Sequence, residues 1–212
     1  MKKKLFLFMM VCALCLFPLT SFAATSDDAV TEDLARQEII DEKPVYAVDA
    51  NGMVTSDIIK NSTTRAAAKT TGKYPTTKGV ILYTKDTVTR IAKVVGHAAI
   101  VYSSKQVVEA TSSGVKRGNN NWNKKKHCRA GMIPVLSKKA MSKVANKCNS
   151  WLGKPYNYYF TNTKTRAKFY CSQLVWAGYK DSAGYNLNSG NVIVFPSELI
   201  SSRSVAVIYK KG

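Results

Sequence analysis

The stretch that decides the fold is Phe169-Tyr170-Cys171-Ser172-Gln173-Leu174-Val175-Trp176. Leu174, Val175 and Tyr179 can share one face of a helix, so we expect a helix over Cys171–Tyr179. Cys171 then begins this helix, where unpaired backbone N–H groups and the helix dipole favour an anion and lower the pKa of a thiol. The same N–H groups can stabilise an oxyanion, which makes Cys171 a candidate nucleophile.

A nucleophilic thiol also needs a base and a polar group that orients the base. His97 begins a predicted strand, His97–Tyr102, and Glu109 lies on the next predicted strand, Gln106–Ala110. A loop of this length suits a β-hairpin, which can bring His97 and Glu109 side by side. The residues therefore predict a Cys171/His97/Glu109 site. The alternative is that Cys171 is a small core residue and His97 a hydrogen-bonded structural one.

Strand patterns outnumber helical patterns in the rest of the chain. We expect further strands at Val80–Tyr83, Met132–Leu136 and Val205–Tyr209. A helix is predicted after Ser137, a good N-cap residue, and a brief helical turn after Pro196. These elements predict an α+β fold, in which an antiparallel β-sheet packs with the nucleophile-bearing helix. The sequence contains no internal repeat, phosphate-binding glycine loop or nucleotide fingerprint.

Charge divides the chain into two parts. Nine acidic and two basic residues lie between Asp27 and Asp57, whereas residues 58–212 contain 27 basic and four acidic ones. With 212 residues, 45% of them hydrophobic, the chain has room for one domain with appendages, and its composition excludes collagen-like and wholly disordered proteins. We therefore expect an acidic segment, residues 24–71, before a strongly basic domain, residues 72–212.

The first 23 residues have the pattern of a secretory signal peptide. Lys2–Lys4 are positive, Leu5–Leu19 are apolar, and Ser21-Phe22-Ala23 is a small-x-small cleavage site. An apolar run of about 15 residues is shorter than the ~20 needed to span a bilayer, which favours cleavage near Ala23 over a retained anchor. The sequence thus predicts a secreted or cell-envelope protein.

The acidic segment 24–71 is poor in aromatic residues and ends in polar runs. We expect a flexible arm with a short helix at Thr31–Ile40. A second interpretation is a pro-segment whose negative charge docks on the basic domain and covers its groove.

Three cysteines remain after removal of the signal peptide: Cys128, Cys148 and Cys171. In an exported protein an odd count indicates one disulfide and one free thiol, and Cys128 with Cys148 is the candidate disulfide. A zinc site is disfavoured, because His127 and Cys128 are adjacent and the spaced four-ligand pattern is missing. His127 follows three lysines and is predicted to lie in a solvated loop. No metal or cofactor is expected.

The order of the motifs resembles that of the permuted papain-like cysteine amidases of the NlpC/p60 superfamily, in particular its YiiX-like branch. In unpermuted members the Cys comes before the His, whereas here His97 precedes Cys171. The resemblance covers about residues 72–210, with little information between 115 and 150. The motifs that carry it are Gly79-Val80-Ile81-Leu82, Gly96-His97-Ala98-Ala99-Ile100-Val101, Val107-Val108-Glu109-Ala110, Leu152-Gly153-Lys154-Pro155-Tyr156-Asn157, Phe169-Tyr170-Cys171-Ser172-Gln173-Leu174-Val175-Trp176 and Phe195-Pro196-Ser197-Glu198-Leu199.

The resemblance implies a role for each residue of the site. Cys171 is implied as the nucleophile, His97 as general base and then acid, and Glu109 as the group that orients the imidazole. Tyr170 and Ser172, beside the nucleophile, are candidates for the oxyanion or substrate pocket.

Two positions depart from the family pattern. Gly79-Val80 stands where the family often has Gly-Asp, and Tyr156-Asn157 where it often has Tyr-Asp. Both departures leave the predicted triad intact and put a substrate-side or structural carboxylate in doubt.

These observations predict an exported cysteine hydrolase that cleaves an amide or ester bond through a Cys thioester, with a cell-wall (peptidoglycan) peptide as substrate. The alternatives are a lipid-directed acyl hydrolase or acyltransferase, and a non-catalytic basic module that binds the envelope. A strongly basic domain is attracted to anionic wall polymers or membrane surfaces. Nucleic acid is not an expected partner, because the chain has a signal peptide and no base-reading motif.

Overall fold

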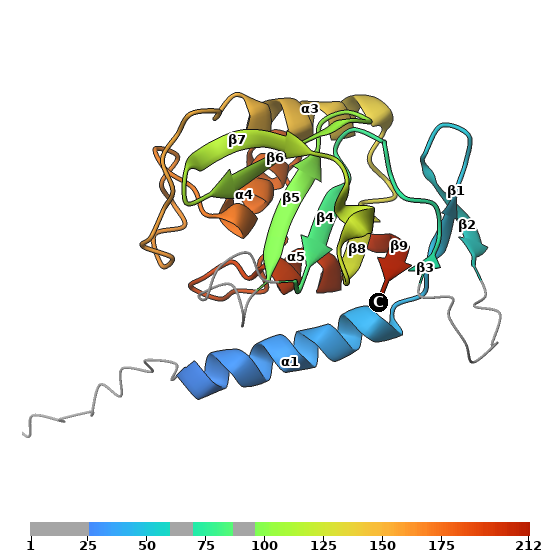
Figure 1. Ribbon diagram of the computed structural model, residues 1–212, viewed down its shortest axis with the longest axis horizontal. Coiled ribbons are helices and arrows are strands. Elements are labelled where there is room, and N and C mark those ends of the chain that lie inside the picture. The colour runs from blue at the N-terminus through green and yellow to red at the C-terminus, as the bar shows by residue number, and fades with distance from the viewer. Residues whose placement is uncertain (1–25, 60–69, 87–95) are drawn as a thin grey trace, which may run out of the picture.

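An antiparallel sheet forms the centre of the protein (Figure 1). The computed structural model describes residues 26–59, 70–86 and 96–212. Within these residues the sheet has seven strands in the order β3-β9-β8-β4-β5-β6-β7. The strands are β3 (Thr70–Thr71), β4 (Ile81–Thr84), β5 (His97–Val101), β6 (Gln106–Thr111), β7 (Gly114–Asn119), β8 (Cys128–Met132) and β9 (Ala206–Lys211).

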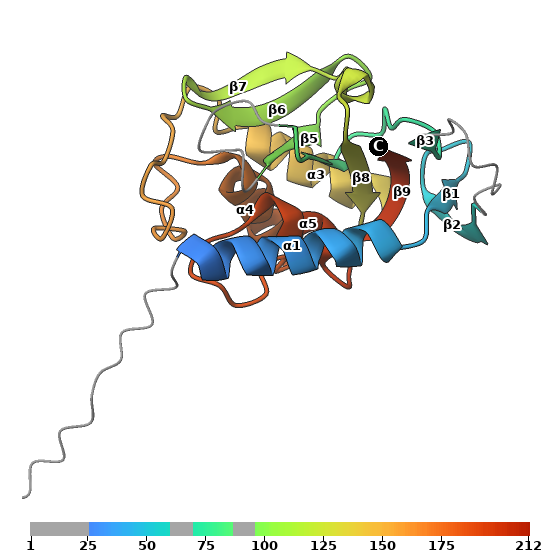
Figure 2. The same cartoon turned by 60° about the horizontal axis from the view of Figure 1, so that its bottom comes forward.

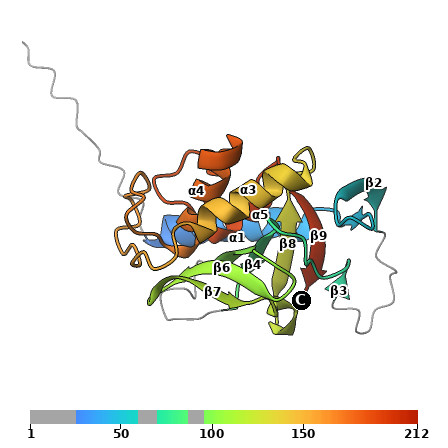
Figure 3. The same ribbon diagram turned by 90° about the horizontal axis from the view of Figure 1, so that it is seen from above.

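Two helices pack together against one side of this sheet (Figure 3). They are α3 (Lys138–Asn149), which begins at the predicted N-cap Ser137, and α4 (Cys171–Ala183), which contacts β5 and β6. The short helix α5 (Pro196–Ser201) contacts β4 and β8, and a 3₁₀ turn, η1, covers Trp122–Lys124. The predicted α+β class, with an antiparallel sheet and a helix that begins at Cys171, is confirmed.

The fourth predicted strand is wrong in its position. The chain pairs over Cys128–Met132, whereas Met132–Leu136 was expected. Pro134 has no N–H to donate to a ladder, and the N–H of Leu136 donates instead to the carbonyl of Ile133, which forms a turn. The edge strand β7 had no prediction, because Gly114–Asn119 lacks the apolar alternation of a half-buried strand.

The acidic segment differs from a mobile arm over its described part. Residues 26–42 form the helix α1 (Ser26–Glu42), and β1 (Tyr46–Val48) pairs with β2 (Val54–Ile58) in a small separate sheet. Ile40 and Val45 are buried in the main core. The predicted signal peptide, residues 1–23, lies outside the described residues, and in the described part no helix is long and apolar enough to cross a membrane.

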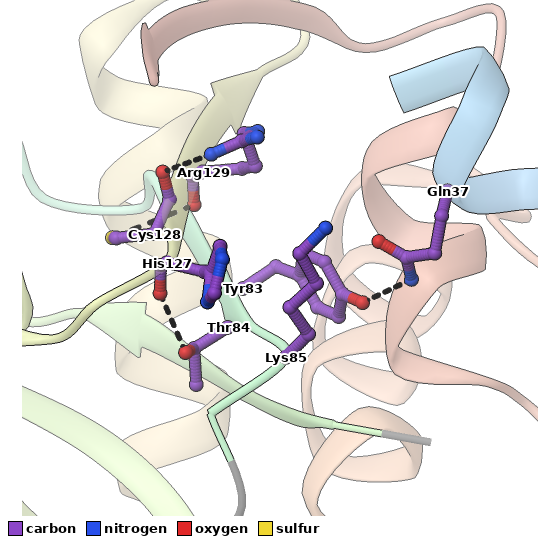
Figure 4. Close-up of a pocket in the computed structure, with 7 residues that line it drawn as sticks. All are labelled: Gln37, Tyr83, Thr84, Lys85, His127, Cys128 and Arg129. Carbon is purple, nitrogen blue, oxygen red and sulfur yellow. Dashed lines mark hydrogen bonds between the residues drawn. The ribbon is translucent and has the colours of Figure 1, made fainter. Parts of the chain in front are cut away.

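Polar contacts join α1 to the sheet. The Gln37 amide donates to the Tyr83 hydroxyl in a small depression between α1, β4 and β8 (Figure 4). Arg129 Nη2 lies 2.7 Å from Asp41 Oδ1. Lys43 Nζ donates to three backbone carbonyls, at Ile200, Ser202 and Val205. Residues 37–43 of the acidic segment are therefore part of the folded domain.

The predicted Cys128–Cys148 disulfide is also incorrect, because both residues are free thiols. Cys128 lies in β8, opposite Lys211 of β9. Cys148 lies on the face of α3 that packs on α4, where its Sγ contacts the Leu174 carbonyl at 3.5 Å. The two thiols thus have separate packing roles.

Gly79 allows α3 and α4 to approach the start of β4. Its φ is +94°, and a Cβ there would lie 2.5 Å from the Met141 carbonyl oxygen. The Gly79 carbonyl accepts a 2.7 Å hydrogen bond from the Tyr179 hydroxyl. Any side chain at Gly79 would both strain the backbone and separate these elements.

We therefore expect Gly79→Ala to destabilise the protein more than Gly153→Ala. Gly153 also has a positive φ, of +81°, but a Cβ there meets nothing within 4 Å. Gly153→Ala should lower the free energy of unfolding by about 1–2 kcal/mol, the cost of the left-handed conformation. Gly79→Ala should cost about 1–3 kcal/mol more, because of the steric clash. Urea unfolding of both variants measures the difference, and equal losses would contradict the role given to Gly79.

Candidate active site

Cys171, His97 and Glu109 meet at the junction of α4 with the β5–β6 hairpin. Glu109 lies opposite Ala99, so His97 and Glu109 are neighbours on the same face, two residues apart in register. His97 Nε2 lies 2.9 Å from Glu109 Oε2, and the imidazole forms a second hydrogen bond with the Cys171 side chain. Since Nε2 contacts Glu109, Nδ1 is left for Cys171. The three residues predicted from the sequence are thus brought together.

The electrostatics favour a thiolate beside an imidazolium. Cys171 and His97 are each only 7% exposed. Burial alone raises the pKa of Cys171 and lowers that of His97, but their mutual hydrogen bond and opposite charges outweigh it. The pKa of the Cys171 thiol is lowered, and that of His97 is raised to about 9. Backbone N–H groups of Ala98 and Ser172 also stabilise the sulfur anion.

Glu109 stays ionised in spite of its partial burial. Burial raises the pKa of its carboxyl, and the hydrogen bond and charge of His97, with the charges of Lys116 and Lys125, lower it by more. Gly118 on β7 leaves room for this carboxylate, because a Cβ there would lie 2.2 Å from Glu109 Oε1. A fixed carboxylate on Nε2 holds the imidazole ring in place and stabilises its charged form.

Trp122 forms one wall of the site, and the sequence analysis missed it. Its ring stacks on the His97 imidazole with centroids 5.4 Å apart and planes at 25°. Its backbone N–H donates to the Tyr74 hydroxyl at 3.0 Å, and Lys125 Nζ lies 5.0 Å from the ring centroid. Trp122 lies in the turn η1, within the stretch 115–150 that contributes little to the family resemblance. Only the asparagine-rich turn before it was a local signal.

Gln173 fixes the start of α4. Its Oε1 accepts hydrogen bonds from the Tyr170 N–H at 3.3 Å and from Asn157 Nδ2 at 2.9 Å. Its Nε2 donates to the carbonyls of Asn162, Thr163 and Thr165 in the preceding loop. Asn157, which stands where the family often has Asp, is therefore a fully buried hydrogen-bonding residue. An amide suits this position, because it can donate to Gln173 and to a carbonyl.

Tyr170 and Ser172 flank Cys171, and both side chains bind the backbone of Val194. The Tyr170 hydroxyl accepts a 2.9 Å hydrogen bond from the Val194 N–H. The Ser172 hydroxyl donates a 2.6 Å bond to the Val194 carbonyl. These contacts give both side chains a structural use, while the Ser172 N–H interacts with the Cys171 sulfur. Backbone N–H groups at the start of α4 are therefore the available oxyanion donors.

A series of aromatic rings lies beside Cys171. Tyr170 contacts Phe160 at a centroid distance of 5.3 Å, and Phe160 contacts Tyr156 at 6.5 Å. Tyr156 lies 4.9 Å from the ring of Tyr158, whose side chain is exposed. Tyr156 is close enough to Cys171 for a thiolate to raise the pKa of its phenol, an effect second to burial. One side of the nucleophile is thus apolar and aromatic.

The second histidine belongs to another cluster. His127 Nδ1 lies 2.9 Å from Asp86 Oδ1, and the imidazole is partly exposed. The Asp86 carboxylate also accepts the backbone N–H groups of Lys126 and His127. Among the residues that the structure describes, no group of three His, Cys, Asp or Glu side chains is placed to hold a metal ion.

Comparisons with known proteins agree with this geometry. A family model described as permuted papain-like amidase enzyme, YaeF/YiiX, C92 family, matches residues 76–194. A solved structure from Escherichia coli, named metalloprotein yiiX, superposes with a TM-score of 0.53 at 19% identity, over 64% of this chain and 97% of that one. No curated protein matches the chain.

We expect Cys171 to react rapidly with iodoacetamide at pH 6–7, because a thiolate needs no deprotonation. In His97→Ala the thiol pKa should rise, and each unit by which it exceeds the pH should slow labelling about tenfold. Peptide mass spectrometry locates the label and measures its rate. Cys128 and Cys148 are internal controls that should react only after denaturation, since burial raises their thiol pKa values, to about 12 for Cys128. Slow labelling of wild-type Cys171 would contradict the ion pair.

Glu109→Gln should lower the pKa of His97 by about 1–3 units from its value of about 9, because the opposite charge beside Nε2 is lost. NMR titration of the imidazole C–H protons measures this change, since the chain contains two histidines. The matched control is Asp86→Asn, which removes the carboxylate beside His127. A His97 titration that moves with Asp86→Asn, or not at all with Glu109→Gln, would contradict the assignment.

Proposed function

The chain belongs to the YaeF/YiiX family of permuted papain-like amidases, and we propose that it hydrolyses an amide bond through a thioester on Cys171. The observation that carries this proposal is the hydrogen-bonded series Cys171–His97–Glu109, with 2.9 Å between His97 Nε2 and Glu109 Oε2. It supplies a nucleophile, a base and an orienting carboxylate in contact with one another.

The proposed reaction has two stages. The Cys171 thiolate attacks the amide carbon, and the oxyanion forms near the backbone N–H groups at the start of α4. The His97 imidazolium gives its proton to the leaving amine, so the C–N bond breaks and a thioester remains. His97, now neutral, takes a proton from water, whose oxygen attacks the thioester. The carboxylic acid leaves and the Cys171–His97 pair is restored, while Glu109 keeps the imidazole oriented throughout.

We further propose that the enzyme acts outside the cytoplasm. The support is the charged, apolar and small-x-small pattern of residues 2–23, which is typical of cleaved signal peptides. Edman sequencing of the exported protein should find Ala24 as the first residue. Retention of residues 1–23 in the exported protein would contradict cleavage.

A cell-wall peptide is the first proposed substrate class. An exported amidase has peptide amides of peptidoglycan within reach, and a strongly basic domain is attracted to anionic wall polymers or phospholipid surfaces. The second class is an acyl lipid, for hydrolysis or acyl transfer. It is favoured by one observation, the series of aromatic rings Tyr156, Phe160 and Tyr170 beside Cys171, since an acyl chain packs well on such rings.

The decisive assay incubates the mature protein separately with muropeptides and with N-acyl and O-acyl lipids. We expect one class to be cleaved and to leave an acyl group on Cys171, seen as a mass increase of the peptide that contains it. Cys171→Ala should lower turnover by about 10³-fold or more. Its control is Cys148→Ala, which removes a buried thiol outside the site and should keep turnover within about threefold when folded. Equal turnover by Cys171→Ala and wild type would refute the proposed nucleophile.

A further inference from the structure

The N-terminal helix α1 lies across the short helix α5 (Figure 2). Both helices lie outside residues 76–194, the part of the chain that the amidase family model matches. The contact between α1 and α5 is therefore a feature of this chain that the family match leaves unexplained.

Two side chains of α1 make the polar part of this contact. Asp33 is 6% exposed, and its Oδ1 accepts a 2.6 Å hydrogen bond from the Ser197 hydroxyl. The Arg36 guanidinium lies 4.7 Å from the centroid of the Phe195 ring and 3.8 Å from Glu198 Oε1. The Asp33 carboxylate thus restricts the Ser197 side chain, and the Arg36 guanidinium restricts the Phe195 ring.

Glu198 connects this contact to the loop before α5. Its Oε2 accepts the Phe195 N–H at 2.9 Å, and its Oε1 accepts hydrogen bonds from Ser189 and Asn191. Glu198 is 2% exposed, so these bonds form in a water-poor environment where they are strong. The loop from Ser189 to Phe195 is thereby tied to the first turn of α5.

The same loop reaches the nucleophile. Val194, next to Phe195, binds the Tyr170 hydroxyl through its N–H and the Ser172 hydroxyl through its carbonyl. Tyr170 and Ser172 are the residues on either side of Cys171 in the sequence. The backbone at 194 thus restrains Cys171 from both sides.

We propose that Asp33 and Arg36 of α1 are positioning residues for Cys171, acting through Ser197, Phe195 and Val194. This inference rests on the proposed function only in taking Cys171 as the nucleophile. A displacement of the 189–195 loop would loosen Tyr170 and Ser172, and shifts of about 1 Å at a reacting group can cost about 10²-fold in rate. The acidic segment then supports the site, in contrast to a pro-segment that covers it.

The contacts of α1 agree with the proposal that this helix supports the site. They include contacts with α5, with Tyr83 of β4 and with Arg129 of β8. The charges of α1 also have specific partners: Asp41 lies near Arg129 and Lys85. Arg36 lies near Glu32 on its own helix and near Glu198 of α5. The helix is thus held by specific partners on α5, β4 and β8.

The test is the pH profile of iodoacetamide labelling at Cys171 in the mature full-length chain, which requires no substrate. We expect Asp33→Ala and Arg36→Ala each to raise the apparent pKa of Cys171, which moves the midpoint of the labelling profile to higher pH; at any pH below that pKa, each unit of increase slows labelling about tenfold. Ser197→Ala should have the same effect as Asp33→Ala, and the double variant no more than either one, because both remove one contact. The matched control is Glu38→Gln, an exposed acid of the same helix, which should leave the profile unchanged.

Two results would overturn the proposal. One is an unchanged labelling profile in folded Asp33→Ala and Ser197→Ala, which would make the α1–α5 contact purely structural. The other is faster labelling, which would show that α1 shields the thiol. If Asp33→Ala does not fold, Ser197→Ala and Arg36→Lys provide the same comparison. A wild-type thiol with an ordinary pKa would instead count against the proposed function, so the two failures are distinguishable.

Discussion

The contact between the Cys171 thiol and the His97 imidazole is the interaction on which the rest of the site depends. Two buried opposite charges are stable only when their remaining hydrogen-bonding positions are filled. Here Glu109 occupies Nε2, backbone N–H groups of Ala98 and Ser172 approach the sulfur, and Trp122 covers the imidazole face. Each surrounding element thus compensates part of the desolvation cost of one ion pair.

The hairpin and the nucleophile helix were predictable because their signals are local. A short loop between two apolar strands fixes the register that puts Glu109 near His97, and Cys171 begins a helix that its own sequence favours. The meeting of Cys171 with His97 could be predicted only by resemblance to a family, because no periodicity relates residues 74 positions apart.

Trp122, Val194 and Asp33 escaped prediction for a related reason. Trp122 lies in a 3₁₀ turn, and Val194 contributes only backbone groups, which any residue but proline carries. Asp33 is one of nine acids in a stretch that resembles a solvated segment, and burial distinguishes it from Glu38 only after folding. The composition of the acidic segment predicted its charge correctly but not its structure, because a few buried residues hardly change the average composition of a segment.

Charge alone also fails to explain how the acidic segment binds. Attraction between a negative segment and a basic domain is screened beyond about 8–10 Å at physiological salt and specifies no orientation. Ile40 in the core, Asp33 on Ser197 and Lys43 on three carbonyls do specify one. Lys43 is a basic residue of the acidic segment, yet it binds carbonyls of α5 and of the turn after it, which attraction between a negative segment and a basic domain does not explain. The orientation of α1 therefore follows from short-range packing and hydrogen bonds, and this short-range character is what enables a helix outside the family domain to influence the geometry around a single thiol.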